Sequence, residues 1–195
     1  MTLLILGLLM FLGTHSVRMV ADGWRARTIA RVGPLAWKGA YALVSLLGFA
    51  LIGWGFAQAR LQPVVLWAPP VFLKHLNALF TLVAFVLVAA AYVPRNQIKA
   101  RLHHPMLLGV KFWALGHLLA TGTLADVLLF GAFLLWASAD FRAARQRDRR
   151  LGTVYAPGTA GASALAVIVG VLAWALFAFW LHAAWIGVAP LGRTL

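Results

Sequence analysis

Residues 94–120, PRNQIKARLHHPMLLGVKFWALGHLLA, place a basic segment directly before an apolar run that begins at Pro105. Proline suits the first turn of a helix, where its missing N–H costs no hydrogen bond. The apolar run has the composition of a membrane helix. Lysine and arginine just before such a helix are typical of the cytoplasmic side of a membrane. The stretch therefore predicts a helix that enters the bilayer from the cytoplasm.

The whole chain has the composition of an integral membrane protein. Hydrophobic residues make up 63% of the 195 residues and charged residues 11%, whereas soluble domains average about half and about a quarter. The chain contains no cysteine and no glutamate, which excludes disulfides and thiolate ligands. The net charge of +13 comes from basic residues between apolar runs. This pattern favours membrane topology over nucleic-acid binding, so we expect no nucleic-acid partner.

Breaking the chain at charged and proline-rich stretches predicts an all-α, polytopic membrane bundle of about six helices, in contact with membrane lipids. The spans are expected at residues 2–20, 35–59, 70–93, 105–120, 122–141 and 163–187. The first, third and fifth loops are basic and the others are not, so the N-terminus and the C-terminus are both expected outside. Small residues within the spans should let helices approach closely; they include Gly48, Gly55, Gly109 and Gly116. No internal repeat is visible, and a single domain over residues 1–195 is expected.

Histidines are the strongest functional signal in the spans. His103, His104 and His182 fall near expected interfaces, whereas three others fall within or close to the hydrocarbon: His15, His75 and His117. Histidine is the commonest metal ligand, and helix bundles hold metal and haem sites in their cores. A lone histidine in such a core is usually only hydrogen-bonded. Three in one small bundle point to a haem or metal site.

Depth in the membrane favours one pair of ligands and allows another. At ~1.5 Å per residue, His117 lies ~10 Å and His75 ~8 Å below the outer face. His15 lies ~18 Å deep by the same reasoning. Depth therefore favours His75 with His117 around one iron, and it allows His15 with His117.

Other polar residues have simpler expected roles. Lys111 can extend its long side chain to the headgroups, and Asp126 can cap the fifth span. Asp126 is also near enough in sequence to hold His117 in one tautomer, as carboxylates do around metal ligands. Asp140 and Asp148 are expected to pair with neighbouring arginines.

An ordered set of motifs resembles the NnrU family of bacterial membrane proteins, over about residues 3–150. The motifs are FLGTHSVRMVADGWR, WKGAYALVSLLGF, PVVLWAPPVFLKHL, NQIKARLHHPMLLGVKFWALGHLLATGTLAD and LLFGAFLLWASAD. Residues 151–195 carry little of the resemblance and are expected to form a linker and an extra C-terminal helix. The resemblance implies a multi-pass protein of the bacterial inner (cytoplasmic) membrane, linked to denitrification and nitric oxide metabolism.

The NnrU family is related to 15-cis-zeta-carotene isomerase, a membrane enzyme that contains haem b. The resemblance matches His15, in THS, to one of its haem ligands, and His117, thirteen residues after His104 in HHP, to the other. It thus selects His15 with His117. Ala114 stands where that isomerase has an alternative cysteine ligand, so a ligand switch through a thiolate is not expected. Arg18, one turn after His15, is a candidate partner for a haem propionate, and His104 is a candidate supporting residue.

Two functions from different classes follow. The first is a haem-binding membrane protein; if it is an enzyme, it is a haem-dependent isomerase or oxidoreductase, acting on a small apolar substrate or a nitrogen oxide. The alternative is a non-catalytic assembly or partner-binding protein of the membrane, without a cofactor. A transporter is disfavoured, because inverted repeats and broken helices are not visible in the sequence.

Overall fold

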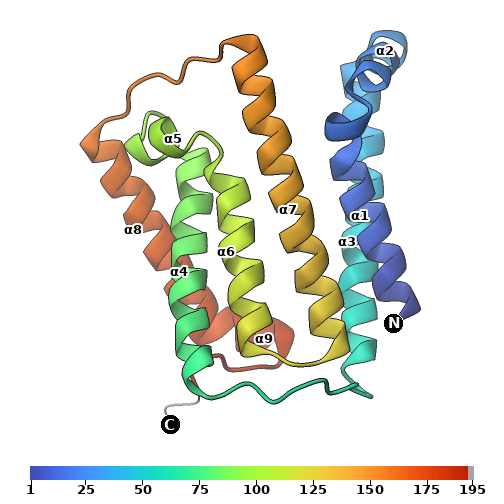
Figure 1. Ribbon diagram of the computed structural model, residues 1–195, viewed down its shortest axis with the longest axis vertical. Helices are drawn as coiled ribbons and strands as arrows, with labels where there is room; N and C mark the ends of the chain where they lie inside the picture. The colour runs from blue at the N-terminus through green and yellow to red at the C-terminus, as the bar shows by residue number, and fades with distance from the viewer. Residues whose placement is uncertain (193–195) are drawn as a thin grey trace. The chain divides into compact units, whose positions relative to one another are not determined.

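The computed structural model describes residues 1–192, and this part of the chain is built of helices (Figure 1). They are α1 Thr2–Val20, α2 Asp22–Val32, α3 Pro34–Ala59, α4 Phe72–Tyr92, α5 Gln97–Leu102, α6 Pro105–Ala120, α7 Leu124–Leu151, α8 Ala160–Leu176, the π-helical turn η1 Phe177–Leu181, and α9 His182–Ile186. Among the described residues, β-structure is limited to isolated bridges such as that of Val65 with Thr123. The predicted all-α fold class is confirmed.

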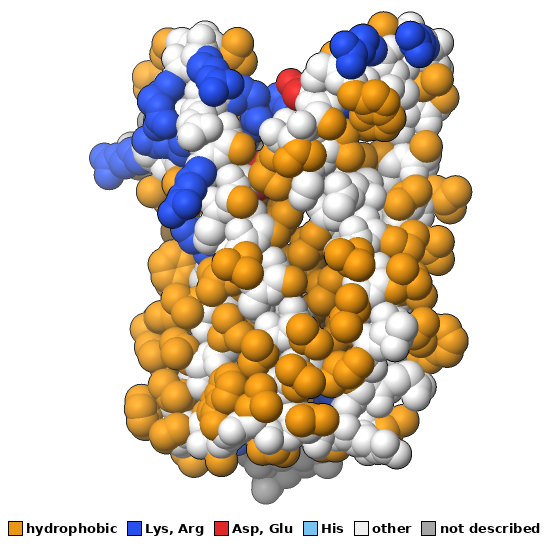
Figure 2. All heavy atoms as spheres, turned by 45° about the vertical axis from the view of Figure 1, so that its right-hand side comes forward, with side chains coloured by type: hydrophobic (Ala, Val, Ile, Leu, Met, Phe, Trp, Pro, Cys, Tyr) orange, Lys and Arg blue, Asp and Glu red, His pale blue; other side chains and the backbone are white. Residues whose placement is uncertain are grey.

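Five helical stretches are long and apolar enough to cross a membrane. They are Thr2–Val20, Pro34–Ala59, Phe72–Tyr92, Leu124–Leu151 and Ala160–Ile186. The remaining predicted span, the fourth, is α6, which is apolar but has only 16 residues. Large side chains on these helices remain uncovered by protein, for example Leu9 at 68% and Phe49 at 63% exposure. Figure 2 shows hydrophobic side chains along the visible face and Lys and Arg gathered at helix ends. The chain is therefore a multi-pass membrane protein.

The contacts within the chain form two compact units. The first comprises Met1–Trp67 and Thr123–Trp136, and the second comprises Ala68–Gly122 and Ala137–Leu195. Helix α7 thus contributes its first half to one unit and its second half to the other. The sequence showed no boundary of this kind, because the division falls inside an uninterrupted apolar helix.

In the first unit, α1 packs directly on α3 through glycines. A methyl group added to Gly48 would lie 2.8 Å from the Phe11 backbone nitrogen, and one added to Gly7 would lie 2.6 Å from the nitrogen of Ile52. The two backbones are therefore in contact, as in membrane helix pairs that associate through small residues. The close approach predicted at Gly48 and Gly55 is confirmed.

In the second unit, α4 packs against both α6 and α8. A methyl group on Gly109 would lie 3.0 Å from the Ala84 carbonyl oxygen. On the α8 side, Trp174 Nε1 donates a hydrogen bond to Thr81 Oγ1 at 3.1 Å, and the backbone N–H of Gln97 donates to Ser163 Oγ at 2.9 Å. The C-terminal helix is therefore an integral part of this unit rather than an appendage.

Three segments expected to be loops contain helix instead. Helices α2 and α5 lie within the first and third basic loops, and α7 continues through the whole fifth basic segment to Leu151. That segment, FRAARQRDRR, is rich in residues that favour helix and lacks glycine and proline. The helix ends where Gly152 adopts a positive φ of 60°, a conformation that glycine accepts readily. Hydropathy located the end of the apolar stretch but missed the end of the helix.

Candidate functional site

His15 lies on α1 with one ring nitrogen already engaged. Its Nδ1 is 2.7 Å from the carbonyl oxygen of Phe11, one turn earlier in the helix. A carbonyl oxygen only accepts hydrogen bonds, so Nδ1 carries the proton and the neutral ring keeps its lone pair on Nε2. Metal-ligating histidines show this arrangement, in which a bond from the second ring nitrogen fixes the tautomer and the ring orientation.

Aromatic rings surround the His15 imidazole. Phe11 stacks on it at a centroid distance of 4.2 Å, and Tyr41 and Trp136 approach edge-on at 5.3 and 6.0 Å. The indole Nε1 of Trp136 is buried and has no hydrogen-bond partner among the described residues. An unsatisfied buried donor costs ~1–3 kcal/mol. The surroundings of His15 therefore lack one acceptor, which an oxygen of a bound group would provide.

His117 lies in the last turn of α6 and repeats the arrangement of His15. Its Nδ1 is 2.8 Å from the carbonyl oxygen of Trp113, again one turn earlier, so the neutral ring keeps its lone pair on Nε2. His117 belongs to the second unit and His15 to the first, so the pairing of these two residues as ligands stays a prediction.

His75, the partner favoured by depth, is placed differently. It lies in the first turn of α4 with an exposed side chain. Within residues 1–192 it makes no hydrogen bond, ring contact or ion pair. Nothing among its neighbours therefore fixes its tautomer or orientation, unlike those of His15 and His117.

Asp126 has the capping role that the sequence predicted. Its Oδ2 accepts hydrogen bonds from the backbone N–H and the hydroxyl of Thr123, at 3.1 and 2.6 Å. Thr123 Oγ1 in turn accepts from the Asp126 backbone N–H at 3.3 Å. This reciprocal pattern is a capping box at the start of α7. The group that orients His117 through Nδ1 is the Trp113 carbonyl.

The residues directly before α6 belong to a polar cluster in the second unit. His104 Nε2 and the hydroxyl of Tyr155 both donate to Asp148 Oδ2, at 2.7 and 2.9 Å. Asp148 was expected to pair with neighbouring arginines. This prediction is wrong, because its carboxylate pairs with His104 instead. Tyr155 was not singled out from the sequence, since one aromatic residue in a polar linker carries no periodic signal.

The neighbouring His103 completes this cluster. Its backbone has a positive φ of 66°, its ring stacks on Tyr155 at 4.1 Å, and its Nδ1 accepts from the Arg145 guanidinium at 2.9 Å. Burial and the hydrogen bond to Asp148 together raise the pKa of Tyr155 from 10.0 to about 12. The cluster fastens the segment before α6 to the end of α7.

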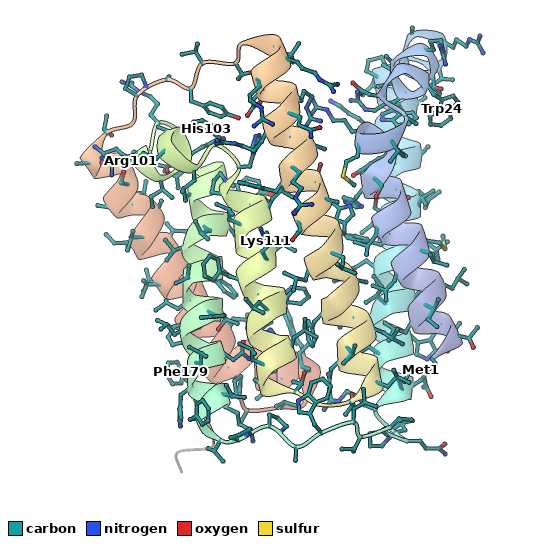
Figure 3. All side chains as sticks on the ribbon, in the orientation of Figure 1. Met1, Trp24, Arg101, His103, Lys111 and Phe179 are labelled. Atoms are coloured by element: carbon teal, nitrogen blue, oxygen red, sulfur yellow. The ribbon has the colours of Figure 1, made fainter. Side chains whose placement is uncertain are left out.

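The cationic side chains of Lys111 and Arg18 lie in different surroundings. Lys111 points from α6 toward α7 (Figure 3), with its Nζ 5.3 Å from the centre of the Phe141 ring. This is a cation–π contact, which the sequence did not predict. Arg18 lines a cavity of the first unit together with Arg25 and Lys38. Its expected contact with a haem propionate stays a prediction.

In the part of the chain that the structure describes, no three His or Asp side chains converge as a metal-ion site would require. A haem needs only two axial ligands from the protein. The donor chemistry of His15 and His117 fits this requirement, since Nδ1 of each ring bonds a main-chain carbonyl and Nε2 is the nitrogen that could act as a ligand.

The fold defines a multi-pass helical membrane protein, and two of its histidines, His15 and His117, each bond a main-chain carbonyl through Nδ1. The model of one protein family, described as NnrU protein, matches residues 3–190. The chain therefore belongs to the NnrU family, and the match extends beyond the motifs recognised in the sequence to include the C-terminal helix. No curated protein and no solved structure matches the chain.

Proposed function

We propose that this NnrU-family protein binds haem b, and that His15 and His117 would hold the iron through Nε2. The observation that carries the proposal is the matched local hydrogen bonding of the two rings: in each, Nδ1 donates to the carbonyl four residues earlier, at 2.7 and 2.8 Å. His75 lacks any such bond, so the structure supports the pair chosen by the resemblance over the pair favoured by depth.

The surrounding residues suit an iron porphyrin. Hydrogen bonds from Nδ1 to a carbonyl raise the basicity of the imidazole and hold its plane. Phe11, Tyr41 and Trp136 place aromatic surface around His15, and such apolar surroundings exclude water and tune the redox potential of a haem. The buried Trp136 N–H offers a hydrogen bond to an oxygen of the bound group. When bound, the haem would supply one-electron redox chemistry.

We infer the class of reaction from membership of the NnrU family and from the resemblance to a related enzyme. Membership supports a place in the bacterial inner membrane and a link to denitrification or nitric oxide metabolism. The resemblance to 15-cis-zeta-carotene isomerase supports haem-dependent isomerase or oxidoreductase chemistry on a small apolar substrate. Both classes use the same two histidines, so haem binding is the step to test first.

The test is an absorption spectrum of protein purified after expression with ample haem, first oxidised and then reduced with dithionite. We expect a Soret band, with sharp reduced bands of a six-coordinate haem. His15→Ala and His117→Ala should lose these bands, whereas His75→Ala and His182→Ala should keep them. Folded protein with a featureless spectrum, or full haem in both ligand variants, would overturn the proposal.

A featureless spectrum would leave the non-catalytic alternative, in which the protein assembles with a partner. The feature that favours it is the basic end of α7, where Arg142, Arg149 and Arg150 are exposed. In that case the bonds of His15 and His117 to Phe11 and Trp113 would be structural only. A partner that co-purifies with the wild-type protein, and is lost when these arginines are replaced by glutamine, would support this function.

A further inference from the structure

A partly open cavity in the first unit lies among α1, α2 and α3. It has a volume of about 410 Å³, within the ~300–1,000 Å³ typical of small-molecule sites. The lining residues are Thr14, Val17, Arg18, Arg25, Ile29, Pro34, Trp37, Lys38 and Tyr41. Three of these side chains are cationic and none is acidic.

Two of the three cations are without an acidic partner. Arg25 forms an ion pair with Asp22, at 3.3 Å. Arg18 and Lys38 make no ion pair and no hydrogen bond to any residue that the structure describes. Two uncompensated positive charges on opposite helices, α1 and α3, face one cavity, so the site is complementary to an anion.

The cavity continues into an apolar hollow. A second pocket of about 180 Å³ shares Thr14, Val17, Trp37 and Tyr41 with the first. Its remaining walls are Trp24, Ala40 and Val44. A ligand that fills both pockets has an anionic end and an apolar end.

Helix α2 places this double pocket at the edge of the membrane. It lies at the ends of α1 and α3 (Figure 1) and carries Arg25, Arg27 and Arg31 together with Trp24, which is labelled in Figure 3. Trp24 and Trp37 contact edge-to-face at 5.8 Å. Tryptophan beside clustered arginine is typical of the boundary between headgroups and acyl chains, where anionic lipids meet basic residues.

We propose that the α1–α2–α3 cavity binds an acidic phospholipid, with its phosphate between Arg18 and Lys38 and the start of an acyl chain in the hollow beside Trp24 and Val44. Two observations carry this assignment: the two unpaired cations, and the apolar continuation of the pocket. It gives Arg18 a partner other than the haem propionate expected from the sequence.

The experiment titrates delipidated protein in detergent with phosphatidylglycerol, and with phosphatidylcholine as the zwitterionic comparison, and follows bound lipid by native mass spectrometry. The variant is Arg18→Gln with Lys38→Gln. Its matched control is Arg27→Gln with Arg31→Gln, which removes the same amount of charge from α2, outside the lining of both pockets. We expect about 30-fold weaker binding of phosphatidylglycerol in the variant and little change in the control.

Equal losses of phosphatidylglycerol binding in the variant and the control would overturn the proposal. They would show that binding depends on the total positive charge rather than on Arg18 and Lys38. Equal binding of phosphatidylcholine by the wild type would also overturn it. Inorganic phosphate should not displace the lipid; if it does so at matched concentration, the site recognises free anions. Arg18→Lys with Lys38→Arg keeps both charges and should bind nearly as well, which separates binding from folding.

The haem and lipid proposals fail independently. The variant lacking His15 and His117 should keep its lipid, because neither histidine lines either pocket. In the variant lacking Arg18 and Lys38, loss of haem with retained lipid would assign the cavity to the propionates and overturn the lipid site.

Discussion

Nε2 of His104 lies 2.7 Å from Oδ2 of Asp148. His104 directly precedes α6, and Asp148 lies in the last turns of α7. The side chains of both are 18% exposed. A hydrogen bond to a charged group in such partly buried surroundings contributes more than a surface ion pair does. Tyr155 donates to the same carboxylate oxygen, so one oxygen ties three separate segments of the second unit together.

Asp148→Asn should lower the pKa of Tyr155 from about 12 toward 10.0. The negative carboxylate opposes formation of the tyrosinate anion, and the amide does not, although burial of the ring persists. Because the folded-state pKa is raised, the neutral phenol stabilises the fold below about pH 10, and this stability is lost as the pH rises through 12. NMR of ¹³C-labelled tyrosine measures the shift, with Tyr155→Phe assigning the signal; an unchanged pKa in Asp148→Asn would contradict the hydrogen bond.

Asp126→Ala should lower stability and leave the haem spectrum unchanged. Asp126 and Thr123 form the capping box of α7, and loss of such a cap typically costs ~1 kcal/mol. His117 is oriented by the Trp113 carbonyl, so the carboxylate is not needed for ligation. Thermal unfolding and the Soret band of the same sample check both parts. A shifted Soret band would instead show that Asp126 acts on the haem site.

The apolar spans followed from the sequence because they depend on local signals, namely runs of apolar residues. THS and HHP singled out His15 and His117 through the family resemblance, and their role as ligands stays a prediction. The Asp148–His104–Tyr155 cluster could not be read in this way, since its members are 44 and 51 residues from His104 and their pairing depends on packing. The sequence predicted the capping role of Asp126 but not that of Thr123, and the capping box requires both residues.

Gly48→Ala should destabilise the first unit by ~1–3 kcal/mol, because the new methyl group would lie 2.8 Å from the Phe11 backbone nitrogen and would force α1 away from α3. Gly53→Ala is the matched control on the same helix, where nothing lies within 4 Å of the added carbon. This control should gain helix propensity and be neutral or slightly stabilising. The two melting temperatures in detergent provide the measurement, and equal temperatures would exclude direct backbone contact.

Trp136→Phe should have opposite effects with and without haem. In haem-free protein the change removes a buried donor that has no acceptor among the described residues, so stability should stay level or rise. If an oxygen of the bound haem accepts from Nε1, the same change should weaken haem retention several-fold. Haem transfer to apomyoglobin measures that retention. Trp24→Phe, whose indole lies away from His15 on α2, should leave the transfer rate unchanged.

Added imidazole should restore the six-coordinate haem spectrum in His15→Ala. If His15 serves as a ligand through Nε2, a free imidazole can occupy the space that the side chain leaves among Phe11, Tyr41 and Trp136. A histidine with a purely structural role would show no such rescue, because the lost bond from Nδ1 to the Phe11 carbonyl is local to α1. His75→Ala is the control, since it should hold haem without imidazole and should not respond to it. Rescue of His75→Ala but not of His15→Ala would assign the axial position to the pair that depth favoured.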